Sequence, residues 1–409
     1  MVRCRICKSA NMKKFLDLGV VPLANSYLKK EELGKPEYAE RLDVYFCVDC
    51  GLVQLGTVVP PDKMFSHYLY YSSNSPALMR HFSDYADAVA AMHEDKNKAF
   101  VVEMGSNDGI LIRNFKRHGI RFLGVDPAAN IAKKANEEGL PTLNEFFNSK
   151  TAAEIAGKHG KATAIIGNNV FAHIDNIHDV VDGANVLLSE DGFLVLEFPY
   201  LVNLLENDEF DTVYHEHLSY FSVTPLIKFF SMHNMEIFDV QRTEIHGGSI
   251  RVFAQRKGGP RKASDSVSRL LELEKKLGIA DFRTYQDFAG RVQKLKATLV
   301  SVLSKLRAEG KHVAAYGAPA KGNTLLCFCG IGTKLIDFTV DRSPYKQGLY
   351  TPGSHIPIFA PEELLKRKPD YVLVLSWNFA QEIIKQQDAY LKAGGKFIIP
   401  IPEPRIFPK

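Results

Sequence analysis

The decapeptide VYHEHLSYFS, residues 213–222, brings together several side chains that can exchange protons. Its two tyrosines, two histidines and glutamate are Tyr214, His215, Glu216, His217 and Tyr220. A histidine changes charge near neutral pH and therefore suits a general base, while hydroxyl and carboxyl groups can assist it. We predict that this segment lines a substrate pocket. Two alternatives stay open: a metal site, which lacks a third ligand at a recognisable spacing, and a loop whose histidines are only structural.

Four cysteines in the first fifty residues form two C-x2-C pairs, Cys4, Cys7, Cys47 and Cys50. A two-residue spacer lets both thiolates of a pair reach one ion, and two pairs complete the tetrahedral set that zinc prefers. The long stretch between the pairs exceeds the spacing of a zinc ribbon, so we expect a small folded insertion. Four protein ligands leave no open position, which predicts a structural zinc. A redox site, which needs only one pair, is the alternative.

A glycine turn follows the apolar run VVEM and could hold a nucleoside-containing ligand. Its pattern, E-x-G-x-x-x-G, comprises in order Glu103, Gly105, Asn107, Asp108 and Gly109. Glycines let the backbone approach a ligand closely at the end of a strand. The next apolar run, RFLGV, ends at Asp126, where an acid can accept hydrogen bonds from two ribose hydroxyls.

This spacing differs from the G-x-G-x-x-G of a dinucleotide site and resembles the S-adenosylmethionine site of class I methyltransferases. The resemblance implies that Asn168 and Asn169, in GNNVFAHI, lie beside the methionine moiety at the end of a fourth strand. It also implies that Phe146 or Phe147 flanks the adenine. A Rossmann-like turn without a ligand is the alternative.

A second glycine turn lies near the C-terminus, in HVAAYGAPAKGNTLL. Backbone N–H groups at a helix start attract phosphate, and a lysine adds a point charge. The residues concerned are Gly317, Lys321, Gly322 and Asn323, with Asp341 at the end of the next strand. Arg251, in IHGGSIRVF, could close over the same substrate, although a plain β-hairpin has the same pattern. A domain that only buttresses the first one is the alternative.

These groups need a scaffold of alternating helices and strands. The helical pattern HFSDYADAVAAMHED is followed by the strand patterns AFVVEM, RFLGV, ATAIIGN and GFLVLEFPY. Such alternation predicts a parallel, doubly wound sheet, with its ligand crevice at the carboxyl ends of the strands. The same rhythm returns after residue 310, and a polar connector with a long helix joins the two parts. We expect Cys327 and Cys329, in the segment CFC, to pack in the core on a strand.

Length and composition restrict the remaining choices. A chain of 409 residues is too long for one ordinary core, and 45% hydrophobic with 24% charged residues is typical of a globular protein. The net charge of +4 is small and no basic block occurs, which argues against nucleic-acid binding. No apolar run reaches the ~18–20 residues of a membrane span. The N-terminus lacks the apolar core of a signal peptide, so we expect a cytoplasmic protein.

The order of the motifs is specific as a set. The cysteine pairs, EMGSNDGIL, YHEHLSYFS, HGGSIRVF and AYGAPAKGNTLL together closely resemble the sugar C-methyltransferases that act on nucleotide-linked keto-deoxysugars. The resemblance covers almost the whole chain and implies an α/β fold of three parts. These are a zinc-binding module (1–75), a class I methyltransferase domain with a catalytic insertion (76–255), and a linker helix with a C-terminal Rossmann-like domain that binds the nucleotide sugar (256–409).

The same resemblance implies roles for individual residues. His217 matches the base, Tyr214 and Glu216 match its companions, and a tyrosine at the end of the zinc module reaches the sugar. Tyr68 fits that last role best among the residues Tyr68, Tyr70 and Tyr71.

The implied reaction is methylation of carbon. A 4-keto group acidifies the proton on C-3, His217 removes that proton, and the resulting enolate attacks the methyl group of S-adenosylmethionine. A thymidine nucleotide is favoured as the carrier, although the nucleobase, the methylated carbon and the oligomeric state stay open. The alternatives are methyl transfer to oxygen or nitrogen, a dinucleotide-dependent oxidoreductase or epimerase, and a binding protein without turnover.

Overall fold

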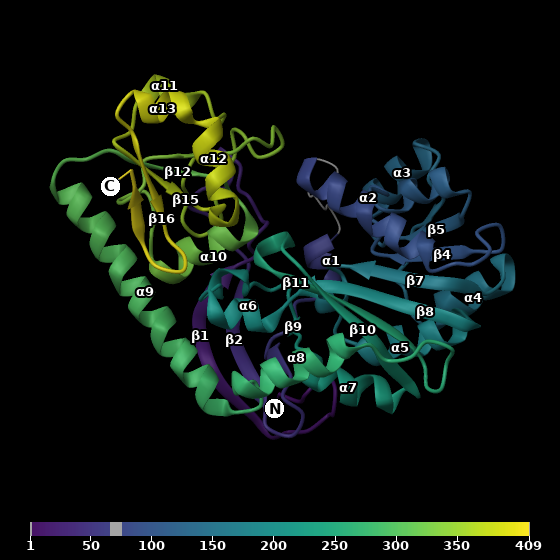
Figure 1. The fold of residues 1–409 in the computed structure, drawn as a ribbon. Helices are drawn as coiled ribbons and strands as arrows, with labels where there is room; N and C mark the ends of the chain where they lie inside the picture. Colours follow the sequence, from purple (N-terminus) through teal and green to yellow (C-terminus); the bar gives the residue numbers. More distant parts are fainter. Residues whose placement is uncertain (1, 66–75, 409) are drawn as a thin grey trace.

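The structure is a computed structural model that describes residues 2–65 and 76–408. Three β-sheets organise these residues into three lobes, which Figure 1 shows from purple at the N-terminus to yellow at the C-terminus. Among the described residues, no helix has both the length and the apolar character needed to cross a bilayer.

The N-terminal lobe is a four-stranded antiparallel sheet in the order β1-β2-β3-β9. Its elements are β1 Met12–Pro22, η1 Lys30–Glu32, β2 Ala39–Cys47, β3 Val53–Leu55, α1 Pro61–Phe65 and β9 Ser219–Tyr220. Alternation along β2 buries Leu42, Val44 and Phe46 on one face. The fourth strand, β9, belongs to the histidine-rich segment. The N-terminal lobe and the candidate catalytic segment therefore share one sheet.

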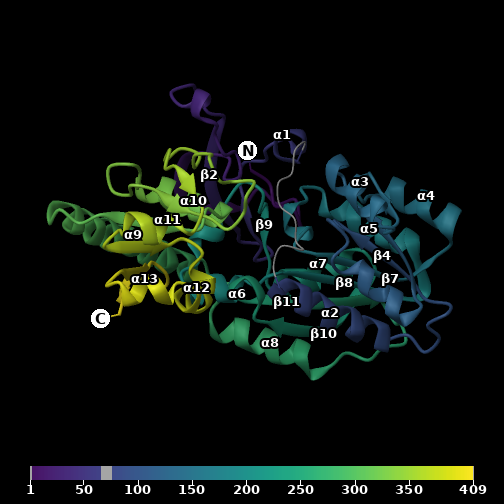
Figure 2. The same ribbon diagram turned by 90° about the horizontal axis from the view of Figure 1, so that it is seen from above.

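The middle lobe is a seven-stranded sheet in the order β10-β11-β8-β7-β4-β5-β6. Only β11 runs in the direction opposite to the other six strands. Helices cover both faces of the sheet (Figures 1 and 2). The strands are β4 Phe100–Met104, β5 Arg121–Val125, β6 Thr142–Leu143, β7 Ala162–Asn168, β8 Leu188–Pro199, β10 Met235–Thr243 and β11 Ser249–Arg256. Residues 193–198 of β8 are all buried, which is why that strand reads as a continuous apolar run.

The helices of the middle lobe connect these strands. They are α2 Pro76–Ala91, η3 Ile112–His118, α3 Ala129–Glu137, α4 Ser149–His159, η4 Phe171–His173, α5 Ile177–Leu187, α6 Leu201–Glu206, η5 Phe210–Thr212, α7 Val223–Met232 and η6 Ile245–Gly247. The start of α4 shows how the sequence sets such a boundary, because the Asn148 side chain accepts a hydrogen bond from the Thr151 N–H at 2.9 Å.

The C-terminal lobe is a six-stranded sheet in the order β14-β13-β12-β15-β16-β17, parallel except for β17. Its strands are β12 Val313–Tyr316, β13 Thr339–Val340, β14 Ile358–Phe359, β15 Tyr371–Val374, β16 Lys396–Ile399 and β17 Arg405–Phe407. Its helices are α10 Ala320–Cys329, α11 Glu363–Arg367, η7 Trp377–Phe379, α12 Ala380–Gln386 and α13 Asp388–Lys392.

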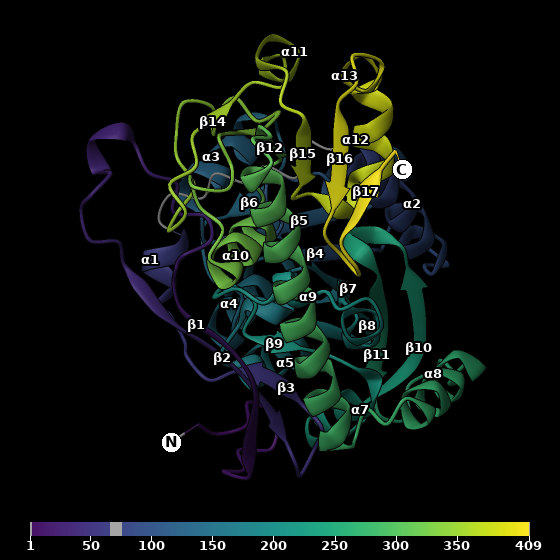
Figure 3. The ribbon, with the colours of Figure 1, turned by 90° about the vertical axis from the view of Figure 1, so that its left-hand side faces the viewer.

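The connector differs from the expected single long helix. It consists of α8 Asp265–Lys276 and α9 Phe282–Ala308, separated at Gly278, whose φ of +68° ends the first helix. Figure 3 shows α9 running along the molecule from its base to the C-terminal sheet. Leu295, Leu299 and Leu303 recur at four-residue spacing and are buried, so one face of α9 packs on the lobes it joins.

A second expectation is corrected in the C-terminal lobe. Cys327 and Cys329 lie in helix α10 and not on a strand, because the turn that follows β12 leads directly into a helix. Cys329 is buried as expected, whereas Cys327 is only half-buried.

Candidate active site

A cleft with a volume of about 1530 Å³ lies between the middle and C-terminal lobes. Its walls include both glycine turns and the histidine-rich segment. The predicted site residues on these walls are Gly105, Asn107, Asp126, Asn168, Asn169, Tyr214, Glu216, His217, Gly317, Lys321 and Asp341. The carboxyl ends of two parallel sheets therefore face one space, which is where doubly wound folds bind their ligands.

The first glycine turn is shaped for close approach of a ligand. Gly105 has a φ of +63°, and a Cβ there would lie 2.7 Å from the Val170 side chain, so no other residue fits without strain. The Gly105 N–H donates to the Val125 carbonyl at 2.8 Å, which folds the turn back onto the next strand.

Asp126 is held at the end of β5 by the same turn. Its two carboxyl oxygens accept the N–H groups of Asn107 and Ala128, each at 2.9 Å. Burial raises the pKa of Asp126, and the two N–H donors oppose that rise. The carboxyl group is thereby fixed on the cleft wall with lone pairs left over, as ribose hydroxyls would require.

Acceptor oxygens without partners stand beside this turn. The Asn168 amide donates to one oxygen of Glu103 at 3.2 Å, which fixes its orientation and leaves its own Oδ1 unpartnered among the described residues. Oδ1 of Asn169 and the second carboxyl oxygen of Glu103 are also buried without a hydrogen-bond partner among the described residues. Burial raises the pKa of Glu103 well above its ordinary value. A cationic ligand with several N–H donors, such as the ammonium of a methionine moiety, fits the amide oxygens of Asn168 and Asn169, which line the cleft.

Both phenylalanines proposed for the adenine lie on the cleft wall. Phe146 is half exposed and Phe147 is buried, so Phe146 has the ring face that a base could cover.

The hydrogen bonds of His217 determine which of its nitrogens carries the proton. Nδ1 lies 2.8 Å from the Thr212 carbonyl oxygen, which can only accept, so Nδ1 bears the hydrogen. Nε2 lies 2.8 Å from the Tyr214 hydroxyl. In the neutral ring Nε2 is consequently the nitrogen with the lone pair, and it lies on the cleft side with Tyr214. This is the tautomer that a general base needs.

A second histidine that we did not predict stands next to His217. His173, at the end of η4, has its ring centroid 5.0 Å from that of His217 and also lines the cleft. Burial lowers the pKa of His173 to about 4, so this ring is neutral at pH 7. The segment GNNVFAHI contains it, but only the two asparagines attracted attention as ligands.

Glu216 is oriented by the N-terminal lobe. The Asn25 amide, which also lines the cleft, donates to its carboxyl group at 2.5 Å. No local pattern around Asn25 signals this role, because the two residues meet only through the tertiary fold.

The second glycine turn repeats the construction of the first. Gly317 has a φ of +90°, and the two oxygens of Asp341 accept the N–H groups of Ala318 at 2.7 Å and Ser343 at 2.8 Å. Asp341 thus directly follows β13 as Asp126 directly follows β5, and each is bonded to the preceding glycine turn and to the residue two positions on. The parallel geometry favours a second ribose-like group in the C-terminal lobe.

Lys321, in the first turn of α10, adds positive charge to this wall. Its Nζ lies 4.1 Å from the centroid of the Trp377 ring, and the Trp377 indole N–H donates to Asp211 at 2.6 Å. Burial lowers the pKa of Lys321, and the carboxyl groups of Asp211 and Glu209 oppose this. The charges of Lys321, Asp211 and Glu209 therefore influence one another.

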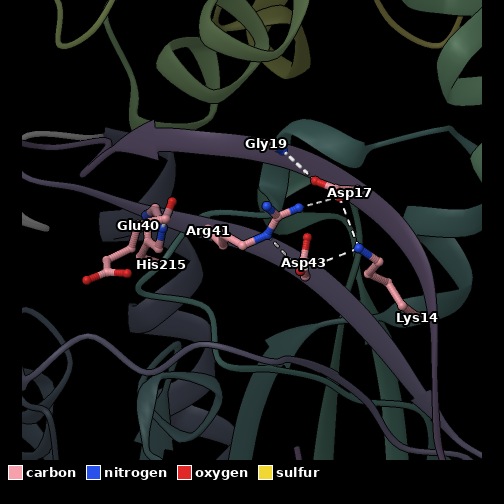
Figure 4. A network of polar contacts seen from close by, with 7 residues as sticks. All are labelled: Lys14, Asp17, Gly19, Glu40, Arg41, Asp43 and His215. Atoms are coloured by element: carbon pink, nitrogen blue, oxygen red, sulfur yellow. Dashed lines mark hydrogen bonds and ion pairs between the residues drawn. The ribbon is translucent and has the colours of Figure 1, made fainter.

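Several predicted residues lie away from the cleft, which corrects the prediction that they line it. His215 is buried against the N-terminal sheet, where its Nε2 lies 3.1 Å from the Glu40 carbonyl oxygen (Figure 4). Tyr220 is buried within β9. Neighbouring residues of the segment point in different directions, so it cannot present all five side chains to one space.

Arg251 and Asn323 have structural partners instead of the substrate. Arg251 lies on β11 of the β10–β11 hairpin. Its guanidinium nitrogen lies 2.8 Å from a carboxyl oxygen of the fully buried Glu197, and its Cζ lies 3.5 Å from the centroid of the Tyr85 ring. The Asn323 amide donates to the Ala24 carbonyl at 2.7 Å.

The remaining predicted residues either pack next to the cleft without lining it or fall outside the residues that the structure describes. Glu103, Asp108, Gly109 and Gly322 do not lie on the cleft walls; a Cβ at Gly109 would lie 2.5 Å from Leu140, and one at Gly322 would lie 2.8 Å from Leu375. Tyr68, Tyr70 and Tyr71 fall outside the described residues.

The four N-terminal cysteines converge on one point. Their sulfur atoms all lie within 4.8 Å of one another, with Cys4 and Cys50 at 3.4 Å and Cys7 and Cys47 at 3.5 Å. Four thiolates at this separation fit a tetrahedral zinc ion with no open position.

The strand order of the middle lobe, its glycine turn and the acid on its second strand define a class I methyltransferase. Residues 77–239 match the family model described as "Methyltransferase domain", which agrees with this assignment. Residues 4–65 match the model described as "Putative zinc binding domain".

The chain belongs to the C-methyltransferase family. Residues 244–402 match the model described as "C-methyltransferase C-terminal domain". The chain is 41% identical over 403 residues to the C-methyltransferase NovU of Streptomyces niveus, covering 98% of this chain and 96% of that protein. Membership makes it a methyltransferase that uses S-adenosylmethionine and carries a zinc-binding module, as the motif order predicted.

Solved structures overlap with it only in part. The magnesium protoporphyrin IX methyltransferase of Synechocystis PCC 6803 with bound SAM is 13% identical, with a TM-score of 0.34 over 48% of this chain and 89% of that one. The plantazolicin methyltransferase BpumL with bound SAH is 10% identical, with a TM-score of 0.36 over 48% and 91%. Both TM-scores are low.

Asp126 provides a test of the donor site. Replacing it with alanine (D126A) is expected to weaken S-adenosylmethionine binding by about 10- to 100-fold, because hydrogen bonds to a charged group contribute ~1.5–3 kcal/mol. Calorimetric titration of the purified protein measures the change. The matched control is D341A, which removes the equivalent carboxyl group from the other lobe and should leave the donor affinity unchanged. Equal losses in both variants would contradict the assignment.

Proposed function

We propose that the chain transfers a methyl group to a carbon atom of a nucleotide-diphosphate 4-keto sugar, at C-3, with His217 as the base. The observation that carries this proposal is the fixed tautomer of His217 in a cleft shared by two turns of nucleoside-binding type. The first turn, with Asp126, would bind S-adenosylmethionine. The second, with Asp341 and Lys321, would bind the nucleoside and the diphosphate.

The geometry of the residues supports the following proposed roles. Nε2 of His217 accepts the proton from the carbon next to the ketone. Nδ1–H continues to donate its hydrogen bond to the Thr212 carbonyl, which keeps the ring in place. The Tyr214 hydroxyl, which bonds Nε2 at 2.8 Å, is released when Nε2 takes up the proton and can then donate to the developing enolate oxygen. S-adenosylmethionine supplies the methyl group as an electrophile on a positively charged sulfur. Neutral His173 beside His217 leaves the base free of a competing positive charge.

One experiment tests this reaction in two halves. The protein is incubated in D₂O with a panel of 4-keto nucleotide sugars, with and without isotopically labelled S-adenosylmethionine. We expect exchange of the C-3 proton without the donor and a new carbon–methyl bond with it. Transfer to an oxygen or nitrogen atom without proton exchange would replace the proposal by O- or N-methylation, and binding without either reaction would make the chain a binding protein.

The carboxyl groups beneath Lys321 predict a pH dependence of nucleotide-sugar binding. Burial raises the pKa of Glu209 to about 7 and that of Asp211 to about 6. Above pH 7 both carry negative charge and outweigh Lys321, whereas below pH 6 both are neutral. Affinity for a diphosphate should therefore rise as the pH falls from 8 to 5.5, by about tenfold.

Binding titrations with an unreactive nucleotide-diphosphate sugar check this dependence, because the bridging diphosphate does not itself titrate in that range. In D211N one charge is absent at every pH, so the affinity at pH 8 should increase and the pH dependence should flatten. A wild-type affinity that is constant or rises with pH would rule out this arrangement of charges at the diphosphate.

A further inference from the structure

Arg5 lies inside the first cysteine pair, between the zinc ligands Cys4 and Cys7, and its side chain turns into the protein. It is 6% exposed, which is rare for an arginine unless the guanidinium is fully bonded. Nη1 donates to the carbonyl oxygens of Leu55 at 2.9 Å and Leu218 at 3.0 Å, and Nε donates to Asp175 at 2.9 Å. One guanidinium thus bonds three separate segments.

Two of those segments carry the histidines of the cleft. Leu218 directly follows His217, and its own N–H donates at 2.8 Å to the carbonyl of Ala172, the residue before His173. Asp175 lies two residues beyond His173. Arg5 therefore bonds the backbone directly after His217 and the side chain of Asp175, which itself lies on the cleft wall two residues after His173.

The backbone of Arg5 is held as firmly as its side chain. Its N–H donates to the Gln54 side chain at 2.7 Å, and its carbonyl lies 3.0 Å from Nε2 of His178. Gln54 pairs with Ser219 across β3 and β9, so the contact leads back to the histidine-rich segment. Because Cys4 and Cys7 lie on both sides of Arg5 and belong to the cysteine cluster, this cluster fixes the place of the Arg5 backbone in the fold.

We propose that Arg5 is a positioning residue through which the zinc module sets the placement of His217 and His173. The proposal rests on His217 being the base, and it gives the N-terminal module a part in the reaction beyond holding the fold together. Only an arginine can serve, because the planar guanidinium makes several directed bonds at once, whereas a lysine ammonium is a point charge. When this donor is lost, the Leu218 carbonyl keeps the Leu55 N–H at 2.9 Å, but the buried Leu55 carbonyl loses its Arg5 donor. The paired backbone of Leu55 and Leu218 then has to readjust, directly after His217.

The test compares R5K and R5M with the matched control R3M. Arg3 belongs to the same loop but is exposed, and within the described part of the chain its side chain bonds only the Lys8 carbonyl of that loop. For each protein we measure zinc content, melting temperature, the dissociation constant of S-adenosylmethionine, proton exchange in D₂O and methyl transfer. The exchange measurement isolates the histidines, since it needs no donor.

In R5K and R5M we expect a full complement of zinc, a donor affinity within about twofold of wild type, and losses of about 10- to 100-fold in both exchange and turnover. Losses of this size are typical when a catalytic group is misplaced by about 1 Å. R3M should behave as wild type. R5M, which lacks any donor, should lose more than R5K, and the profile of exchange rate against pH should shift in both.

Each other outcome decides against a part of the proposal. Wild-type exchange and turnover in R5K would overturn the role of Arg5. If R5K and R5M show lower zinc content, weaker donor binding and a lower melting temperature together, Arg5 is a general structural residue, and its proposed role in positioning the histidines is refuted. If the wild-type protein itself shows neither exchange nor methyl transfer, it is the proposed reaction that fails and not the assignment of Arg5.

Discussion

Replacing His217 with asparagine (H217N) is expected to lower the turnover number by about 10²- to 10⁴-fold, the usual range for loss of a general base. The dissociation constant of S-adenosylmethionine should stay within about twofold of wild type, because we propose that the first glycine turn and Asp126 bind the donor, and these are held by their own hydrogen bonds. Asparagine can still donate to the Thr212 carbonyl, so the backbone around position 217 is retained, but it has no basic nitrogen. Steady-state kinetics and donor titration measure the two quantities separately.

The neighbouring histidine supplies the control for this experiment. H215N changes the same residue type two positions away, but His215 is buried on the N-terminal sheet and bonds Glu40. Asparagine is too short to reach the acceptor of Nε2, so this bond to the N-terminal sheet is lost, but the change lies away from the cleft and turnover should stay close to wild type. If H217N remained active while H215N lost turnover, the base would have been assigned to the wrong histidine.

Removal of one zinc ligand is expected to have an equally large effect, on folding as well as on turnover. C47S breaks the cluster at a fully buried position, and the binding free energy of a structural zinc is largely folding free energy. The zinc content should fall below one ion per chain, the melting temperature should drop, and methyl transfer should be lost. The loss extends to the reaction because β3 of the N-terminal lobe pairs with β9 of the histidine-rich segment.

The cysteines of helix α10 give the matched comparison. In C327S a serine hydroxyl can take over the contact of the Cys327 sulfur with the Pro352 carbonyl, and the zinc cluster is untouched. Full zinc content and wild-type melting are expected. A C47S protein with one bound zinc and unchanged melting would show that the cluster does not hold the module together.

Local patterns in the sequence predicted a large part of this molecule. The parallel strands β4, β7, β12 and β15 are short apolar runs, and each glycine turn follows the end of one of them. Asp126 and Asp341 were found in the same way, because their positions depend only on the next strand's end. The cysteine pairs needed nothing but their spacing.

Residues that meet across the fold were missed or misplaced, for a physical reason. Asn25 reaches Glu216, and Arg5 reaches Leu218, through contacts between distant parts of the chain that leave no periodic signal. In the histidine-rich segment, residue type alone does not tell which side chains face the cleft. His217 does and His215 does not, because β9 is recruited into the N-terminal sheet.

The chain contains a single tryptophan, and Trp377 lies beside Lys321 with its indole on Asp211. Tryptophan fluorescence of the native enzyme consequently originates at one place, beside Lys321 in the C-terminal lobe. A charged ligand arriving there alters the surroundings of that single fluorophore, so occupancy can be followed by spectroscopy without a label and without the methyl donor. Trp377 is therefore an intrinsic fluorescent probe of ligand binding at the C-terminal side of the cleft.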